Sequence, residues 1–191
     1  RRIGHINLFI TNLAHTMDFL HYVCGFIQTG RISKIGSAFV STGNTHHDIG
    51  MIEVEGYQKF AQGKQLPGPA DRGARPGLNH FGWEMESEAD LVEAYQRATD
   101  AGLAPRITNN GTAFSNYLFD PGGLQHQFYA DNVKEWWRVY TGGEVDLHRE
   151  ATWVPGQSEP RTDALYVKDP EIRRVEHAPL HPLRLTHAVM L

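Results

Sequence analysis

The hydrophobic and polar positions of the first 54 residues predict a strand, a helix and three more strands. Residues 3–11 alternate in polarity and are rich in β-branched side chains, which is typical of a strand. Asn12 suits a helix N-cap, apolar residues recur at helical spacing up to Cys24, and Gly25 can end the helix. The three strand-like runs that follow cover residues 26–32, 37–42 and 48–54. This order of elements is βαβββ.

The same order returns about 75 residues further along the chain. Residues 79–85 are strand-like, Ser87 is a possible N-cap, and residues 89–101 have the apolar spacing of a helix that Gly102 ends. Three more strands are predicted at residues 105–108, 114–119 and 125–129. The chain therefore carries a weak internal duplication.

The two copies align by their first-strand histidines. His5 and His80 are each the third residue of a strand segment, in Ile-Gly-His and Leu-Asn-His, and each lies seven residues before a helix N-cap. If the two modules pair about a pseudo-twofold axis, both imidazoles can point to one centre. We therefore expect an α+β fold in which paired βαβββ modules form a curled mixed sheet around one metal site.

The predicted domain organisation has four parts. A first module is followed by a connection rich in Gly, Pro, Gln and Lys, then by a second module, and finally by an irregular extension. We expect the extension to pack on the core or on a partner subunit, with a possible helix from residue 133 to 140. The four parts are residues 1–55, 56–77, 78–131 and 132–191.

Composition narrows the class of protein. The chain has 191 residues, of which 40% are hydrophobic and 21% are charged, and its net charge is −4, so nucleic acid and membrane are not expected partners. The single cysteine, Cys24, excludes an intrachain disulfide and a cysteine-built metal site, and we expect it to pack as a small apolar residue. Because the chain cannot form an intrachain disulfide, a reducing compartment is favoured, and the chain is expected to be cytoplasmic. The 11 histidines invite a metal or acid–base interpretation.

Two motifs then carry a resemblance to a known family. Residues 120–129 read Asp-Pro-Gly-Gly-Leu-Gln-His-Gln-Phe-Tyr, and residues 45–50 read Thr-His-His-Asp-Ile-Gly. Over about residues 3–131 the chain resembles the vicinal oxygen chelate superfamily, which includes glyoxalase I, fosfomycin-resistance proteins and the type I extradiol ring-cleaving dioxygenases.

The resemblance implies a mononuclear metal site. His5 and His80 match two metal ligands, and the third ligand position falls on Gln127, where the family has glutamate. Two histidines and a carboxylate are the usual donors for non-haem Fe(II) with open positions. A neutral amide in place of the carboxylate leaves about one more unit of positive charge, which implies weaker metal binding and a stronger preference for a dianionic substrate.

No other side chain is expected to replace the missing carboxylate. Glu53 lies six residues after His47 on the same strand, about 20 Å away, so both cannot face one metal. His126 is adjacent to Gln127 and so points to the opposite face of the sheet.

The resemblance also implies two catalytic residues. His47 matches the acid–base histidine and Tyr117 matches a tyrosine that hydrogen-bonds the substrate oxygens. The dioxygenases carry another histidine near residues 108–110, a position where this chain offers only Asn109 or Asn110 for a hydrogen bond.

These residues imply an extradiol-type dioxygenase that uses Fe(II) and O2 on a catechol-like aromatic diol. One alternative is a non-redox isomerase, lyase or resistance enzyme of the glyoxalase type with Mn(II), Zn(II) or Ni(II), and another is a ligand-binding protein that kept only the fold. The expected partners are a small aromatic substrate, O2 and further copies of the chain. An aromatic-rich cleft is expected from Phe81, Trp83, Phe114 and Phe119.

Overall fold

The computed structural model describes residues 2–132, 136–138, 140–145 and 153–156. Within these residues, eight strands form one sheet. The strands are β1 (Arg2–Ile10), β2 (Ile27–Ile32), β3 (Ser37–Ser41), β4 (Ile49–Glu53), β5 (Gly77–Glu84), β6 (Arg106–Asn109), β7 (Ala113–Phe119) and β8 (Gln125–Asp131). Their order across the sheet is β2-β3-β4-β1-β5-β8-β7-β6.

The sheet is built from two matching halves that meet between β1 and β5. In each half the first strand pairs parallel with the last, β1 with β4 and β5 with β8, and the remaining neighbours are antiparallel. The two halves join through the antiparallel pairing of β1 with β5. The predicted α+β class, with two βαβββ units in one curled mixed sheet, is confirmed.

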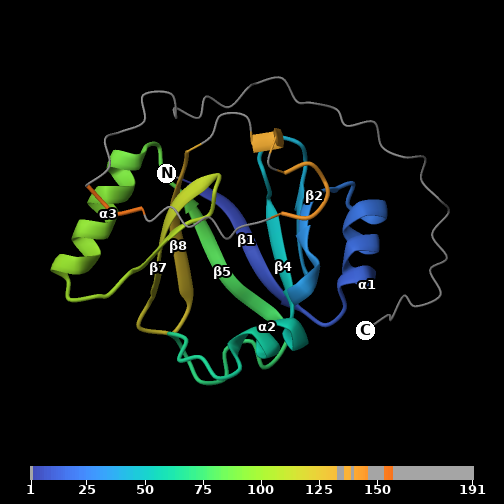
Figure 1. Ribbon diagram of the computed structural model, residues 1–191, viewed down its shortest axis with the longest axis horizontal. Coiled ribbons are helices and arrows are strands. Elements are labelled where there is room, and N and C mark those ends of the chain that lie inside the picture. The colour runs from blue at the N-terminus through green and yellow to red at the C-terminus, as the bar shows by residue number, and fades with distance from the viewer. Residues whose placement is uncertain (1, 133–135, 139, 146–152, 157–191) are drawn as a thin grey trace.

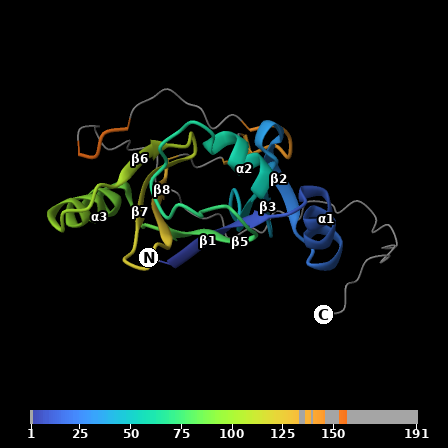
Figure 2. The same ribbon diagram turned by 90° about the horizontal axis from the view of Figure 1, so that it is seen from below.

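The sheet curves strongly across its width. Its edge strands β2 and β6 lie on the same side of the central strands (Figure 2), while α1 (Leu13–Asp18) and α3 (Glu88–Asp100) flank it on the outside (Figure 1). A third helix, α2 (Val54–Ala61), crosses the open concave side. The concave face is therefore partly covered, and it is where a site can form.

The first helix begins as predicted and ends differently. The Asn12 side chain accepts a hydrogen bond from the His15 backbone N–H at 2.9 Å, and Gly25 has the left-handed φ of 76° expected of a helix end. Between them, Phe19–Val23 forms a π-helical turn. That wider turn breaks the 3.6-residue phase of the apolar face. The prediction that Cys24 is packed is accordingly wrong, because its side chain is exposed.

The second outer helix is capped as the sequence predicts. Ser87 accepts a hydrogen bond from the Asp90 backbone N–H at 3.2 Å. The helix buries Leu91 and Ala94 in a cluster that includes Phe114 and Trp153. This packing fixes α3 against the outer face of β7 and β8.

The predicted connection contains a helix that the apolar pattern did not indicate. Gly56 lies in the first turn of α2 and lowers its intrinsic helix propensity. A Cβ atom at Gly56 would lie 2.0 Å from the Ile35 carbonyl oxygen, so the glycine is needed for the close approach of this helix to the chain before β3. Helix α2 also buries Tyr57.

Part of the C-terminal extension packs on the first half of the sheet. Trp136, Tyr140 and Val145 form a buried cluster with Phe39 of β3, so Trp136 is a core residue as expected. Only residues 136–138, a 3-10 turn, and Tyr140 are described from the predicted helix over 133–140, and residues 157–191 lie outside the described part. Among the helices that the structure describes, none has the length and apolar character to cross a membrane.

Candidate metal centre and its cavity

The first-strand histidines lie next to each other on the concave face. In the β1–β5 pairing, His5 is opposite Gly82 and Asn7 is opposite His80, so the two histidines are diagonal neighbours on one face. Their rings are nearly perpendicular, at 81°, with centroids 5.6 Å apart. Both side chains are buried. The structure thus brings these two predicted ligands together.

Gln127 completes the predicted set from the neighbouring strand. It lies on β8 beside Gly82 of β5, and its Oε1 is 3.1 Å from His5 Nε2. Its Nε2 donates a hydrogen bond to Ser115 Oγ at 2.9 Å, which turns the amide oxygen toward His5. Donors bound to one metal at about 2.1 Å and near right angles are about 3 Å apart, so this separation fits a shared ion.

Room for the His5 imidazole depends on Gly82. A Cβ atom there would lie 2.2–2.5 Å from ring atoms of His5, which is closer than such contacts occur. The two imidazoles, the Gln127 amide oxygen and the 3.1 Å separation of His5 Nε2 from Gln127 Oε1 together fit a metal ion.

Burial keeps the histidines neutral. It lowers the pKa of His80 to about 3, and the positive charge of Arg72 adds to the effect. Burial is also the largest cause that lowers the pKa of His5 and of His47 well below the usual value. Neutral imidazoles carry the lone pairs that metal binding and proton acceptance require.

A chain of three buried side chains leads away from the histidines. The His47 ring lies 4.3 Å from the His5 ring, and its Nδ1 is 2.5 Å from His46 Nδ1. His46 Nε2 is in turn 3.1 Å from Asp131 Oδ1. An ionised carboxylate only accepts, so His46 Nε2 carries the proton and His46 Nδ1 accepts from His47. The lone pair of His47 is then on Nε2.

The His-His-Asp run also contains the residue that shapes the turn before β4. Asp48 accepts hydrogen bonds from the Thr42 backbone N–H at 2.7 Å and from Ser41 Oγ at 3.1 Å. This turn holds His46 and His47 inward, where both are buried. The sequence identified His47 and missed His46 and Asp131, although the paired histidines were the available signal.

Tyr117 lies beside the candidate ligands on β7. It is the direct cross-strand partner of Gln127, and its ring meets the His80 ring edge-on with centroids 5.6 Å apart. Burial raises the pKa of its hydroxyl, which therefore stays protonated and able to donate. Asn110 lines the same cavity and its Nδ2 is 3.4 Å from Tyr117 Oη, whereas Asn109 accepts from the Gly111 backbone N–H.

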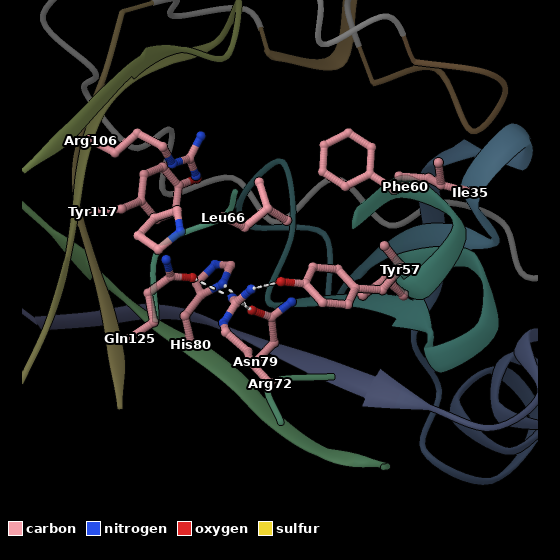
Figure 3. A pocket seen from close by; sticks show the side chains of 12 residues that line it. Ile35, Tyr57, Phe60, Leu66, Arg72, Asn79, His80, Arg106, Tyr117 and Gln125 are labelled. Atoms are coloured by element: carbon pink, nitrogen blue, oxygen red, sulfur yellow. Dashed lines mark hydrogen bonds between the residues drawn. The ribbon is translucent and has the colours of Figure 1, made fainter. Parts of the chain in front are cut away.

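Two adjoining cavities contain these residues. An inner cavity of about 190 Å³ is lined by His5, His47 and Gln127, and an outer cavity of about 260 Å³ opens toward α2. The residues that line both are Ile35, Ile52, Asn79, His80 and Tyr117. The two cavities therefore adjoin each other at His80, and Figure 3 shows the side chains that line the outer one.

Arg72, from the predicted connection, is a cavity residue that the sequence did not indicate. Its guanidinium donates to Tyr57 Oη and Gln125 Oε1, both at 2.5 Å, and to Asn79 Oδ1. Figure 3 shows these side chains gathered around His80, with Arg106 next to Tyr117 on another side of the pocket. The connection thus supplies one wall of the cavity.

A comparison with protein families identifies this architecture. Residues 2–128 match the model of the Glyoxalase/Bleomycin resistance protein/Dioxygenase superfamily. The chain belongs to this superfamily. The resemblance inferred from the sequence motifs is thereby confirmed.

Within the superfamily, the chain is similar to a catechol-2,3-dioxygenase from Bacillus subtilis, with 29% identity over 108 residues. That match covers 56% of this chain and 35% of the relative, so the chain spans about a third of the relative's length.

Solved structures share the superfamily fold with this chain. A Mn(II)-bound glyoxalase from Novosphingobium aromaticivorans has a TM-score of 0.50 at 24% identity, over 68% of this chain and 37% of that one. BphC, a halotolerant catechol dioxygenase, has a TM-score of 0.56 at 20% identity, over 88% and 51%.

The side chains considered as substitutes for the missing carboxylate lie elsewhere. Glu53 Oε1 accepts from the Leu13 backbone N–H at 2.7 Å and so caps α1. His126 faces away from Gln127, as predicted, and accepts a hydrogen bond from Trp83 Nε1 at 2.9 Å. Within the described ranges, no group of three His, Cys, Asp or Glu residues could hold a metal, so a third donor beside His5 and His80 must be a residue of another type, as Gln127 is.

Aromatic side chains line the cavities, but the four residues expected to do so were the wrong ones. None of Phe81, Trp83, Phe114 and Phe119 lines either cavity. Phe81 and Trp83 stack on His126 instead, and Phe114 stacks on Trp153. The aromatic residues that do line the cavities are Phe39, Tyr57, Phe60, Tyr117, Tyr129 and Tyr140.

Proposed function

We propose that this chain carries the site of an extradiol-type ring-cleaving dioxygenase, which uses Fe(II) and O2 on a catechol-like aromatic diol. The proposal rests mainly on one observation: His5, His80 and the Gln127 amide oxygen converge in the cavity that His47 also lines. Membership of the superfamily and similarity to a catechol-2,3-dioxygenase support the proposal.

In this proposal His5 Nε2, His80 and Gln127 Oε1 hold the metal, and the C-terminal extension packs on the core or on a second copy of the chain. When bound, Fe(II) supplies open positions for the two diol oxygens and for O2, together with the electrons that activate it. Both atoms of O2 enter the product, and one ring bond beside the diol breaks to leave a carboxylic acid and an aldehyde or ketone. No external reductant is consumed.

His47 is the proposed acid–base residue. Its Nε2 lone pair faces the cavity, because its Nδ1 proton is engaged by His46. The neutral ring can accept a proton from a diol hydroxyl and return it when the ring opens. Residues 46 and 131 act through His47 and are positioning residues in this scheme.

Tyr117 is the proposed orienting residue. Its hydroxyl remains a donor at neutral pH because burial raises its pKa. A donor held beside His80 can fix a substrate oxygen by a hydrogen bond without competing for the proton that His47 takes.

Oxygen consumption tests the proposal directly. Protein loaded with Fe(II) under anaerobic conditions is mixed with O2 and a panel of catechols, and ring-opened product is followed by absorbance. His47→Gln is expected to lower kcat about 10²-fold or more, while the exposed His15→Gln leaves it unchanged. No O2 uptake with any catechol, despite stoichiometric iron, would contradict the proposal.

A second candidate is favoured by the neutral amide of Gln127. A metal without a carboxylate ligand is more electrophilic, which suits Lewis-acid chemistry of the glyoxalase type with Mn(II), Zn(II) or Ni(II). Metal analysis of protein purified without added iron separates the two. Stoichiometric Mn, Zn or Ni, with isomerase or lyase turnover and no O2 uptake, would select this second function.

A further inference from the structure

We infer that the aromatic substrate carries an anionic substituent, a carboxylate, which binds in the outer cavity against Arg106 with the charge of Arg72 behind it. The inference rests on the proposed function and names its substrate class. It comes from the distribution of charge around the cavities.

The cavity lining is positively charged and holds no carboxylate. Among the described residues that line the two cavities, Arg72 and Arg106 are charged cations and none is aspartate or glutamate. Gln127 removes the one acid that the superfamily motif would have placed beside the metal. A bound divalent ion would add to this charge.

Among the described residues, Arg72 has only neutral hydrogen-bond partners. Its three hydrogen-bond acceptors are a phenol and two amides, from Tyr57, Asn79 and Gln125. None of the ion pairs found in the described part of the chain involves it. Its side chain lines the outer cavity together with His80 and Arg106. A half-buried guanidinium without a counter-ion favours an anion in the space that it lines.

Arg106 is placed to contact the substituent directly. It lies at the exposed start of β6, and its guanidinium carbon lies 4.4 Å from the centroid of the Tyr117 ring. It has no carboxylate partner within the described residues. A guanidinium can bind a carboxylate through two parallel N–H bonds, and Arg106 has its donors available for this.

The layout of the cavity matches a diol and a carboxylate at opposite ends of one ring. The inner end holds the candidate metal ligands and His47, and Tyr117 lines both parts. The outer cavity adds the apolar side chains of Phe60 and Leu66 to Ile35, which lines both cavities, and these suit an aromatic ring. Arg106 lies next to Tyr117 (Figure 3) and lines the outer cavity but not the inner one.

Anaerobic equilibrium binding to the Fe(II)-loaded protein tests this inference. The probes are two catecholic acids, 3,4-dihydroxybenzoate and 3-(3,4-dihydroxyphenyl)propanoate, and their isosteric, uncharged amides. We expect at least one acid to bind about tenfold or more tightly than its amide at low ionic strength, with the ratio falling as salt is added.

Matched variants assign the preference to the arginines. Arg106→Met is expected to bring the ratio of acid affinity to amide affinity close to 1, because it removes the guanidinium that would bind the carboxylate. The exposed position of Arg106 at the start of a strand makes the substitution compatible with folding. Arg72→Met should weaken the ratio, with thermal unfolding as the check on its structure. Arg97→Met, on the outer helix α3 with Glu93 as its ion-pair partner, is the control and should leave the ratio unchanged.

Three outcomes would each overturn the inference. They are equal affinities of the acids and amides, absence of binding by either acid, and an acid preference that survives in Arg106→Met. O2 uptake measured in parallel separates its failure from that of the proposed function. Uptake that is equal with acids and amides leaves the dioxygenase standing and removes the carboxylate site. A strong preference for the acids without O2 uptake supports the carboxylate site and contradicts the dioxygenase activity.

Discussion

At the residue scale, Gly82 determines how closely β5 can approach the His5 ring. Gly82→Ala would place a Cβ atom 2.2–2.5 Å from His5 ring atoms, so the imidazole or the strand must move. We expect metal affinity to fall more than tenfold and the free energy of unfolding to fall by about 1–3 kcal/mol. Isothermal titration with Mn(II) and chemical denaturation measure the two effects.

Gly143→Ala is the matched control for that substitution. Its Cβ atom would have its nearest neighbour at 3.9 Å, and its backbone does not require glycine. Metal affinity unchanged in Gly82→Ala would show that His5 is not held where binding needs it.

The buried histidines predict how stability depends on pH in the metal-free protein. Burial lowers the pKa of His5, His47 and His80, the last to about 3, whereas each titrates near 6.5 in the unfolded chain. Below pH 6.5 the unfolded state therefore binds more protons than the folded state. Their contribution to stability is complete above pH 6.5 and is lost as the pH falls toward 3.

Denaturation midpoints between pH 7.5 and 4.5 test this dependence. The free energy of unfolding obtained from these midpoints is expected to change with pH by at most about 1.4 kcal/mol per pH unit for each histidine. His80→Gln should reduce the slope, and the exposed His15→Gln should leave it as it is. A midpoint that does not change over this range would contradict the burial of these rings.

Asp131 is expected to act on catalysis through the orientation of His47. Asp131→Asn allows the amide to donate as well as accept, so the proton positions along His46 and His47 are no longer fixed. In the proposed dioxygenase, kcat should fall about 10- to 100-fold with little change in KM, and the pH–rate profile should shift. Asp100→Asn, at the exposed end of α3, is the control. Full kcat and an unchanged profile in Asp131→Asn would exclude the positioning role.

At the element scale, the connection between the two halves is a structured wall of the cavity. Tyr57 of α2 receives a hydrogen bond from Arg72 at 2.5 Å, which ties the helix to the chain that follows it. Tyr57→Phe should lower the free energy of unfolding by about 1 kcal/mol and speed tryptic cleavage after Lys64. Denaturant titration and limited proteolysis are the measurements.

Tyr95→Phe, on the outer helix α3, serves as the control for Tyr57→Phe. Equal cleavage rates in the wild type and Tyr57→Phe would mean that the contact does not hold the segment in place.

Regular elements were predictable because their signals are local. The strands and capped helices follow from alternation, N-cap residues and terminal glycines, and the equivalence of His5 and His80 follows from the repeat. Asp131 and Arg72 were not predictable, because their roles arise only when segments distant in sequence meet. Helix α2 was missed since Gly56, needed for packing, obscures its pattern.

At the scale of the whole molecule, the candidate metal ligands span the junction of the two halves. His5 belongs to the first half, and His80 and Gln127 belong to the second. A metal that binds only the folded protein should therefore stabilise it, by about 2.7 kcal/mol at 100 times Kd. We expect thermal unfolding to shift upward on addition of Fe(II) or Mn(II).

Single substitutions show which residues bind the stabilising metal. His5→Ala and His80→Ala should each abolish most of the metal-induced shift in Tm, and His15→Ala should preserve it. A shift that persists in both variants would place the bound metal elsewhere on the protein.

The β1–β5 pairing also has a consequence for how the chain folds. Within each half the paired strands are closer in sequence than β1 and β5 are, as the pairs Ile6–Ile49 and Ile6–Phe81 show, so the pairing of β1 with β5 closes the longer loop. The cavity is therefore absent from either half alone and arises when they dock. Folding intermediates that contain one completed half would have native secondary structure and no binding activity, so ligand capture reports the final step of assembly.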